Sequence, residues 1–155
     1  MVHAKITQDQ LNNFTTNEVL DAEVIDVLNK AATAAKQYSY SPYSKFRVGA
    51  ALLTTEGNIY IGCNVENASY GGAICAERTA FVKAVSSGEK KFIAISVTTD
   101  NDSFVSPCGF CRQFMVEFGK NLLVIETKPS GEFKTFKLSE LLPDSFGPED
   151  LEKSN

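Results

Sequence analysis

The stretch CAERTAFVKAVSSGEKKFIAISVTT, residues 75–99, contains two different patterns in succession. Its first part, residues 75–88, is typical of a helix that ends at Gly88, because glycine is common just after the last helical turn. Its second part, residues 92–99, is an apolar run rich in β-branched side chains, which predicts a buried strand. A helix that leads into a buried strand is typical of α/β proteins.

The same patterns recur on both sides of this stretch. Before it, apolar residues recur at helical spacing, and two β-rich runs flank the predicted turn TEGN. After it, a second helix that ends at a glycine precedes two further strands. The predicted helices are residues 18–37, 75–88 and 108–119 with a short one in the tail 139–155, and the predicted strands are residues 46–54, 58–63, 92–99, 122–127 and 133–138.

These elements predict an α/β fold with three layers, α/β/α, around a five-stranded mixed sheet. The length of 155 residues suits one domain with a single core. Residues 1–17 are polar and are interpreted as an N-terminal extension. Residues 18–155 are predicted to form the single folded domain.

Composition limits the possible partners. The formal net charge is −4 and the isoelectric point is near 5.0, whereas a nucleic-acid-binding protein usually carries a basic face. The apolar runs are shorter than a membrane span, and the first residues lack the apolar segment of a secretory signal. We therefore expect a cytoplasmic protein, with access to the nucleus left open, that binds neither nucleic acid nor membrane.

Three of the four cysteines are predicted to meet at one edge of the sheet. Cys75 begins one predicted helix, while Cys108 and Cys111 share one face of the next. Such helices begin beyond the carboxyl ends of strands, where ligands usually bind. Three thiolates can hold one Zn²⁺ and leave a fourth position open for water, which points to catalysis. Cys63 is interpreted as a small buried residue and not as a fourth ligand.

Charged residues next to these cysteines have predicted roles in the same site. Three thiolates outweigh the charge of Zn²⁺, so hydrogen bonds from nearby cations are needed to draw charge from the sulfurs. Arg78 is favoured for this task over Arg112. Glu77 is predicted to carry a proton from water to a substrate nitrogen. The alternative is a first-turn glutamate that only complements the helix dipole.

Several motifs resemble those of a known family. CAE followed by PCGFC matches the signature of the zinc nucleobase and nucleoside deaminases. The stretches SPYSKFRVGAAL, GCNVENASY, CAERTAF, SPCGFCRQF and ELLP closely resemble the small homotetrameric cytidine deaminases, over about residues 20–150. The resemblance implies a cytidine deaminase-like fold and hydrolysis of cytidine and deoxycytidine to uridine and deoxyuridine plus ammonia, a step of pyrimidine salvage. It also implies that zinc hydroxide attacks C4 while Glu77 protonates N3.

The resemblance implies substrate contacts as well. Asn64 and Glu66 are expected to bind the ribose hydroxyls, and Phe46 to lie against the pyrimidine. The backbone of Ala76 is expected to contact the base, and Phe146 to reach the site of a neighbouring subunit. Without the resemblance, Phe46 would be interpreted as a core residue, Asn64 and Glu66 as turn residues, and Phe146 as a cover for its own subunit's core.

Other functions remain open on the sequence alone. A blasticidin-type deaminase would share the zinc chemistry, but FRVGAAL with NVEN favours a ribonucleoside. A deoxycytidylate deaminase would need a basic phosphate site in the substrate loops, and an RNA- or DNA-editing deaminase would need nucleic-acid-binding elements. A structural zinc or redox module is the alternative of another class, and it gives Glu77 no role.

Overall fold

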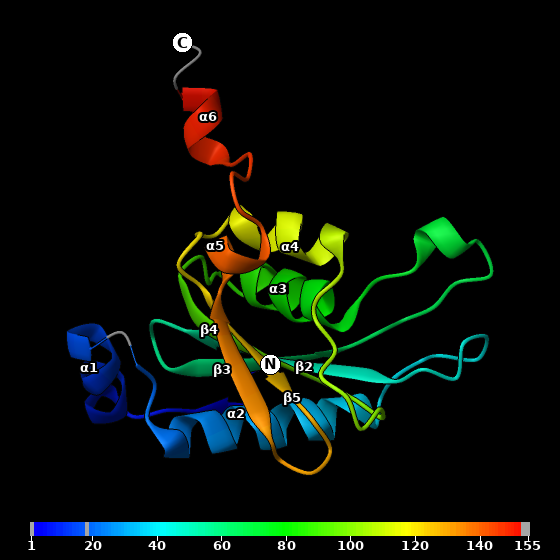
Figure 1. Ribbon diagram of the computed structural model, residues 1–155, viewed down its shortest axis with the longest axis horizontal. Helices are drawn as coiled ribbons and strands as arrows, with labels where there is room; N and C mark the ends of the chain where they lie inside the picture. The colour runs from blue at the N-terminus through cyan, green and yellow to red at the C-terminus, as the bar shows by residue number, and fades with distance from the viewer. Residues whose placement is uncertain (1, 18, 153–155) are drawn as a thin grey trace.

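The computed structural model describes residues 2–17 and 19–152 (Figure 1). One mixed sheet with the strand order β1-β3-β2-β4-β5-β6 runs through the molecule. Strands β4 and β5 are parallel, and all other neighbours are antiparallel. The strands are β1 (Ala4–Lys5), β2 (Val48–Thr54), β3 (Asn58–Cys63), β4 (Phe92–Thr99), β5 (Leu123–Thr127) and β6 (Phe133–Lys137).

Helices cover both faces of this sheet, as Figure 1 shows. Helix α2 packs on one face, where it contacts β2, β3 and β4, while α3 packs on the other face with α4 beside it. The helices are α1 (Gln8–Asn17), α2 (Ala22–Lys36), α3 (Ala76–Ser86), α4 (Gly109–Val116), α5 (Leu138–Leu141) and α6 (Pro148–Glu152), with a short 3-10 helix, η1 (Tyr70–Gly72). The predicted three-layer α/β/α fold is confirmed, and no helix in the described residues is long and apolar enough to cross a membrane.

The prediction of five strands was wrong, because β1 adds a sixth. This strand has only two residues and pairs with the outer edge of β3, with Ala4 opposite Ile59. Two residues are too short to show the alternation that reveals a strand in a sequence. The segment also carries two core side chains, Ile6 and Leu11, which are almost fully buried. Residues of the expected extension therefore pack against the sheet.

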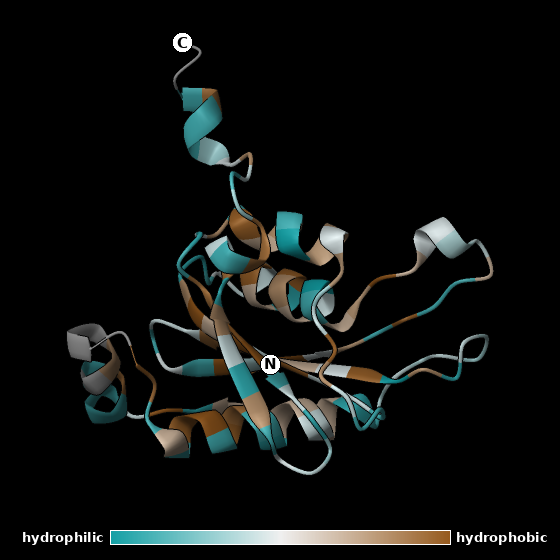
Figure 2. Cartoon of the chain, viewed as in Figure 1, coloured by the Kyte–Doolittle hydropathy of each residue, from teal (hydrophilic) through white to brown (hydrophobic). Residues whose placement is uncertain are grey.

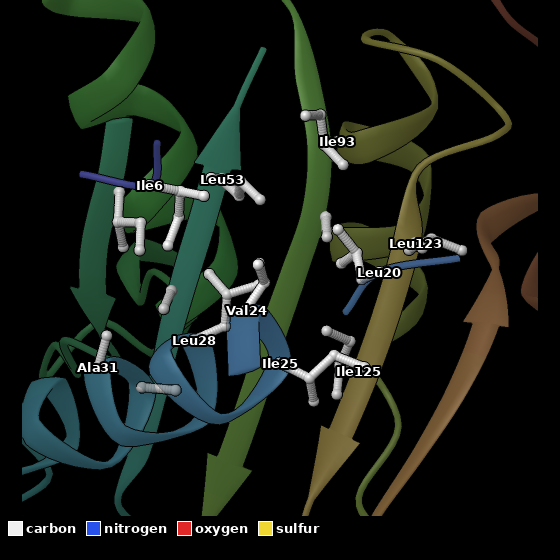
Figure 3. Close-up of a cluster of buried hydrophobic side chains, with 14 of the residues drawn as sticks. Ile6, Leu20, Val24, Ile25, Leu28, Ala31, Leu53, Ile93, Leu123 and Ile125 are labelled. Atoms are coloured by element: carbon white, nitrogen blue, oxygen red, sulfur yellow. The ribbon is translucent and has the colours of Figure 1, made fainter. Parts of the chain in front are cut away.

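Alternation along β2 divides the core into two clusters. Ala51 and Leu53 point toward α2, and their neighbours Ala50 and Leu52 point toward α3 and α4, as the two-residue period of a strand requires. Figure 3 shows the cluster on the α2 side, built from helix, sheet and N-terminal segment. In Figure 2 the sheet strands are mostly apolar, while α6 at the far end of the chain is mostly polar. A strand that is apolar on both faces fits between two layers of helices.

Two glycines let the helices approach the sheet closely. A Cβ on Gly49 would meet the backbone of α2 at Ala32 and Lys36, and a Cβ on Gly62 would meet the backbone of α3 at Ala76 and Ala80. Only glycine leaves room for backbone at such short distances. Gly62 therefore sets the height of α3 above β3, and with it the position of the first turn of α3.

A charged group fixes the end of α2 to the loop after β4. Lys36 is 5% exposed, and its ammonium lies 2.9 Å from Asp100 Oδ1 and donates a hydrogen bond to the carbonyl of Thr99 at 3.0 Å. Arg47 donates to the other Asp100 oxygen at 2.7 Å. This pairing holds the pKa of Asp100 below its usual range, chiefly through the hydrogen bond from Arg47. The buried lysine is therefore compensated, as buried charges must be.

Candidate active site

The first turns of α3 and α4 bring three cysteines together. Cys75 is the residue before α3 and Cys108 the residue before α4, and both have extended backbones that turn the chain into the helix. Cys111 lies in the first turn of α4 and is fully buried. The three sulfurs lie within 4.8 Å of one another, and those of Cys75 and Cys108 are 3.7 Å apart.

This spacing fits a tetrahedral zinc ion. A Zn–S distance of about 2.3 Å and tetrahedral angles place two sulfur ligands roughly 3.8 Å apart, close to the distance between Cys75 and Cys108. All four cysteines are free thiols. Cys63 lies outside the cluster, where its thiol donates a hydrogen bond to the carbonyl of Tyr38. It is only partly buried and not buried as predicted, because it ends β3 at the edge of the sheet. Cys75, Cys108 and Cys111 could therefore supply three ligands to a zinc ion, and they would leave one tetrahedral position for another ligand.

The surroundings of the cluster favour a negative charge on Cys75 and disfavour a second one on Cys111. The pKa of Cys75 is lowered to about 5, chiefly by the hydrogen bond from Cys111 and also by the nearby guanidinium of Arg78. The pKa of Cys111 is raised, because its thiol donates to Cys75 and because it is buried. Thiolates are the form in which cysteine binds a metal. A cation that binds the cluster would therefore replace the remaining thiol protons.

The two arginines near the cluster do different things. Arg78 Nη2 lies 3.8 Å from the sulfur of Cys75 and 3.3 Å from the carbonyl of Ala73. Arg112 instead donates its hydrogen bonds to Pro107 O, Ser106 Oγ and Leu141 O. Arg112 therefore fixes the loop before α4 to the C-terminal segment, while Arg78 is placed to draw charge from a sulfur.

Glu77 is a buried carboxyl group beside the sulfurs. It is 4% exposed, and its pKa is raised to about 7, chiefly because burial disfavours the charged form. A group with a pKa near the working pH can both take up and release a proton. Its position in the first turn of α3 brings it within the same pocket as Cys75.

A pocket of about 240 Å³ opens beside the cluster. Its wall combines residues from the loops and strands at the carboxyl end of β4 with the first turns of the two helices, which is where ligands bind in open α/β sheets. It is mostly apolar, with a few polar groups at one end. The lining residues are Phe46, Val48, Asn64, Cys75, Glu77, Val97, Val105, Ser106 and Cys108.

The predicted substrate residues are distributed unevenly around this pocket. Phe46 and Asn64 line it, whereas Glu66 lines a different pocket with Tyr43 and Tyr70. Ala76 is the first residue of α3 and is fully buried, with its carbonyl against Gly62. Asn64 Nδ2 donates to Phe46 O at 2.8 Å, so the two residues from different loops are joined directly.

Phe146 lies away from the pocket of its own chain. Its ring is 59% exposed, and its carbonyl accepts a hydrogen bond from Gln113 on α4. Helix α6, which follows it, projects away from the sheet in Figure 1. The structure therefore does not bring Phe146 together with the cysteines and Glu77 within one chain.

The sequence did not single out four lining residues, Val48, Val97, Val105 and Ser106. Val48 begins β2, Val97 lies near the carboxyl end of β4, and the other two precede Cys108 in the loop that leads to α4. The signal was available, because residues that follow a buried strand in an α/β sheet line its ligand-binding edge. The zinc signature indicates the cysteines and gives no information about these lining residues.

The chain is similar to proteins of known family. Residues 23–127 match the model of the cytidine and deoxycytidylate deaminase zinc-binding region. A probable cytidine deaminase from Dictyostelium discoideum is 52% identical over 135 residues, covering 85% of this chain and 90% of the relative. A cytidine deaminase from Sporosarcina psychrophila is 46% identical over 128 residues, covering 82% and 94%.

Solved structures agree with these relatives. The crystal structure of a cytidine deaminase from Burkholderia pseudomallei superimposes with a TM-score of 0.76 at 46% identity, covering 78% of this chain and 98% of that one. A cytidine deaminase structure from Mycobacterium tuberculosis gives a TM-score of 0.72 at 39% identity, covering 82% and 99%. Together with the three-cysteine cluster, the buried glutamate and the shared pocket, these likenesses show that the chain belongs to the zinc-dependent cytidine and deoxycytidylate deaminase family.

Proposed function

We propose that this protein hydrolyses cytidine and 2′-deoxycytidine to uridine and 2′-deoxyuridine with release of ammonia. The observation that carries the proposal is one pocket into which a buried carboxyl group, Glu77, and the thiols of Cys75 and Cys108 all open. A redox or structural zinc module has no use for a buried glutamate at that place. Hydrolytic removal of an amino group needs both an activated water and a proton carrier.

The residues of the cluster have separate tasks in this reaction. Cys75, Cys108 and Cys111 would hold the zinc ion, which when bound would supply the acidity that turns a water into a nucleophile near neutral pH. Glu77 would take up a proton on its carboxylate from the attacking water and deliver it to N3 of the pyrimidine. Arg78 withdraws charge from the Cys75 sulfur, which it approaches to 3.8 Å, so that three thiolates do not cancel this acidity.

The pocket wall selects and orients the nucleoside. Phe46 and Val97 line the pocket and offer apolar surface to the two faces of a flat base, with the backbone at Ala76 beside it. Asn64 and Glu66 bind the ribose. The ribose therefore extends from the pocket that Asn64 lines toward the one that Glu66 lines. A ribose contact at the 3′ position serves cytidine and deoxycytidine alike, so both are expected as substrates.

A homotetramer with shared active sites is part of the same proposal. Large apolar side chains are exposed around and beyond the pocket, among them Tyr70, Phe110 and Phe146. Exposed apolar groups of this kind mark contact surfaces between proteins. Phe146, remote from its own pocket, is proposed to complete that of a neighbouring subunit, and light scattering coupled to gel filtration will measure the number of subunits.

The proposed setting follows from the same residues. Four free thiols fit the reducing cytoplasm better than an oxidising compartment, and cell fractionation measures this directly. The net charge of −4 disfavours nucleic acid as a substrate, in line with a free nucleoside. A gel-shift assay at modest salt that gave a stable complex with single-stranded DNA or RNA would contradict this part of the proposal.

The decisive experiment compares the zinc-loaded wild type with zinc-loaded Glu77→Gln. Cytidine turnover is followed by ultraviolet absorbance and ammonia release, and the zinc content of both proteins is measured. We expect turnover in the wild type and a loss of at least about 100-fold in the variant, as for removal of a general acid–base group, with zinc retained. A wild type that holds one zinc per chain and leaves cytidine unchanged would overturn the assignment.

A further inference from the structure

Ser44 joins the loop before β2 to the loop after β3 through Glu66, and both residues line the pocket that also contains Tyr43 and Tyr70. Its hydroxyl lies 2.7 Å from Glu66 Oε1, and its backbone N–H lies 3.2 Å and 3.1 Å from the two oxygens of the same carboxylate. The backbone N–H of Phe46 donates to the Ser44 hydroxyl at 3.0 Å. Because the serine oxygen accepts from Phe46, its own proton is directed toward Glu66.

We propose that Ser44 is a positioning residue that fixes the Glu66 carboxylate for the 3′-hydroxyl of a bound nucleoside. The inference rests on the proposed function, in which Glu66 binds the ribose. Ser44 does not touch the substrate in this scheme. It acts through Glu66, and it sets the rotamer of a long side chain before the nucleoside arrives.

The orientation of the Glu66 side chain depends on Ser44, because few other interactions restrain it. Within the described part of the chain, its side chain accepts hydrogen bonds from Ser44 alone, and it forms none of the ion pairs found there. The residue lies on the loop after β3 and is only partly buried. A glutamate in such a place samples many rotamers unless it is tied.

The hydrogen bonds also determine which groups remain for the ribose. Glu66 Oε1 accepts two of the bonds from Ser44 and Oε2 accepts one, which leaves acceptor capacity chiefly on Oε2. Asn64 Oδ1 already accepts from the Val48 N–H and the Ser39 hydroxyl, and one of its two N–H donors is bound to a carbonyl. The pair therefore offers one acceptor and one donor, which match a hydroxyl that donates to Glu66 and accepts from Asn64.

The test compares two nucleosides on the zinc-loaded protein. Ser44→Ala removes the hydroxyl but keeps the backbone N–H, so Glu66 loses its shortest bond. We expect the KM for cytidine to rise about 10-fold, the scale of one hydrogen bond to a charged group, with kcat within about twofold. With 3′-deoxycytidine, which lacks the group that Glu66 recognises, the change in KM should be less than about twofold.

A matched control uses another serine–glutamate pair. Ser130 contacts the Glu132 carboxylate at 3.4 Å in an exposed turn, away from the pocket residues. Ser130→Ala removes the same kind of bond and should leave the KM for both nucleosides unchanged. Melting temperatures of the two variants should match the wild type, because both serines are exposed.

A second comparison separates action through Glu66 from a general disturbance of the loop. In a Glu66→Ala background the Ser44→Ala change should have little further effect on KM, because the acceptor of its hydrogen bond has been removed. A KM increase that is equal for cytidine and 3′-deoxycytidine, or that persists in full beside Glu66→Ala, would overturn the inference. A wild type without cytidine turnover would instead refute the proposed function, so the two failures are distinguishable.

Discussion

Two glutamates in first helical turns show how position sets the task of a carboxyl group. Glu140 in α5 is exposed, and its carboxylate accepts a hydrogen bond from the backbone N–H of Lys137, so it caps the helix. Glu77 in α3 is buried, and burial raises its pKa to about 7. A buried carboxyl group in a cleft is typical of functional sites. The contrast favours a proton carrier over a helix cap at Glu77.

At the scale of the residue, the cysteine set can be tested by two matched substitutions. Cys75→Ala removes one of three clustered sulfurs, so we expect zinc content to fall well below one per chain and turnover to be lost. Cys63→Ala removes a thiol that lies outside the cluster and donates a hydrogen bond to the Tyr38 carbonyl, so it should keep zinc and activity. Metal analysis of both purified variants checks this. Full zinc retention by Cys75→Ala would contradict the donor set.

Single residues differ in how far the sequence could predict them. The grouping of Cys75, Cys108 and Cys111 was predictable, because helical spacing and the edge of an α/β sheet are both general rules. The link between Ser44 and Glu66 was not, because it depends on how two loops 22 residues apart meet. Local patterns contain no information about such a contact.

The packing of α3 on β3 governs the site at the scale of the element. Gly62 lies where a Cβ would collide with backbone atoms of α3 at Ala76 and Ala80, and Ala76 stands directly between Cys75 and Glu77 in the sequence. A backbone cannot yield as a flexible side chain can. A larger residue here must lift the whole first turn of the helix, together with Cys75 and Glu77.

Gly62→Ala is therefore expected to destabilise the protein by roughly 1–3 kcal/mol, the usual cost of overpacking, and to weaken zinc binding. Gly71→Ala is the control, because a Cβ there would meet open space. Thermal unfolding and competition with a zinc chelator measure the two effects. Equal stability and zinc affinity in both variants would show that α3 does not depend on the contact at Gly62.

The join between α2 and the β4–α4 loop gives a pH-dependent prediction. The pKa of Asp100 is lowered in the folded state, first by the hydrogen bond from Arg47 and then by Lys36. A lowered carboxyl pKa contributes stability above the unfolded value near 3.9, and this contribution is lost as the pH falls through the lower folded value. Stability should therefore decline below about pH 4 in the wild type.

Asp100→Asn should remove this part of the pH dependence and destabilise the protein at neutral pH, by about 1–3 kcal/mol, because Lys36 would keep a buried charge without its partner. Urea unfolding at pH 7 and at several values below 4 provides the comparison. Asp26→Asn is the control, because Asp26 pairs with Lys30 on the exposed face of α2. A neutral-pH stability of Asp100→Asn equal to that of this control would contradict the argument.

Long strands could be predicted from the sequence more accurately than short ones. The strands β3 and β4 were predicted with their observed bounds, because six and eight residues show a clear pattern. Strand β1 has two residues, and the buried Ile6 and Leu11 are separated by polar neighbours that hide them. A segment held by the surface of the rest of the molecule cannot be recognised from its own sequence.

At the scale of the whole molecule, the exposed C-terminal segment bears on the proposed assembly. Phe146 is mostly exposed, and Leu151 of α6 is 62% exposed, while α6 projects from the body in Figure 1. These apolar groups remain in water in a single chain. Burial against a second copy would remove this unfavourable exposure.

A mixing experiment tests whether Phe146 serves a neighbouring site. Phe146→Ala lacks the proposed contribution in trans, and Glu77→Gln lacks the proton carrier in its own site, so each variant alone should have low activity. Tetramers that contain both should regain turnover, because the intact Phe146 of one subunit then completes the intact Glu77 site of another. Mixed tetramers no more active than the sum of the separate variants would contradict a shared site.

The pairing of β1 with β3 has a consequence for how copies of the protein behave at high concentration. The unpaired edge of a sheet attracts strands from other molecules, and β1 covers that edge at Ile59 while Ile6 and Leu11 anchor it in the core. By occupying part of that edge, this short segment should reduce pairing with strands of other molecules. A variant without β1 is therefore expected to aggregate more readily at high concentration.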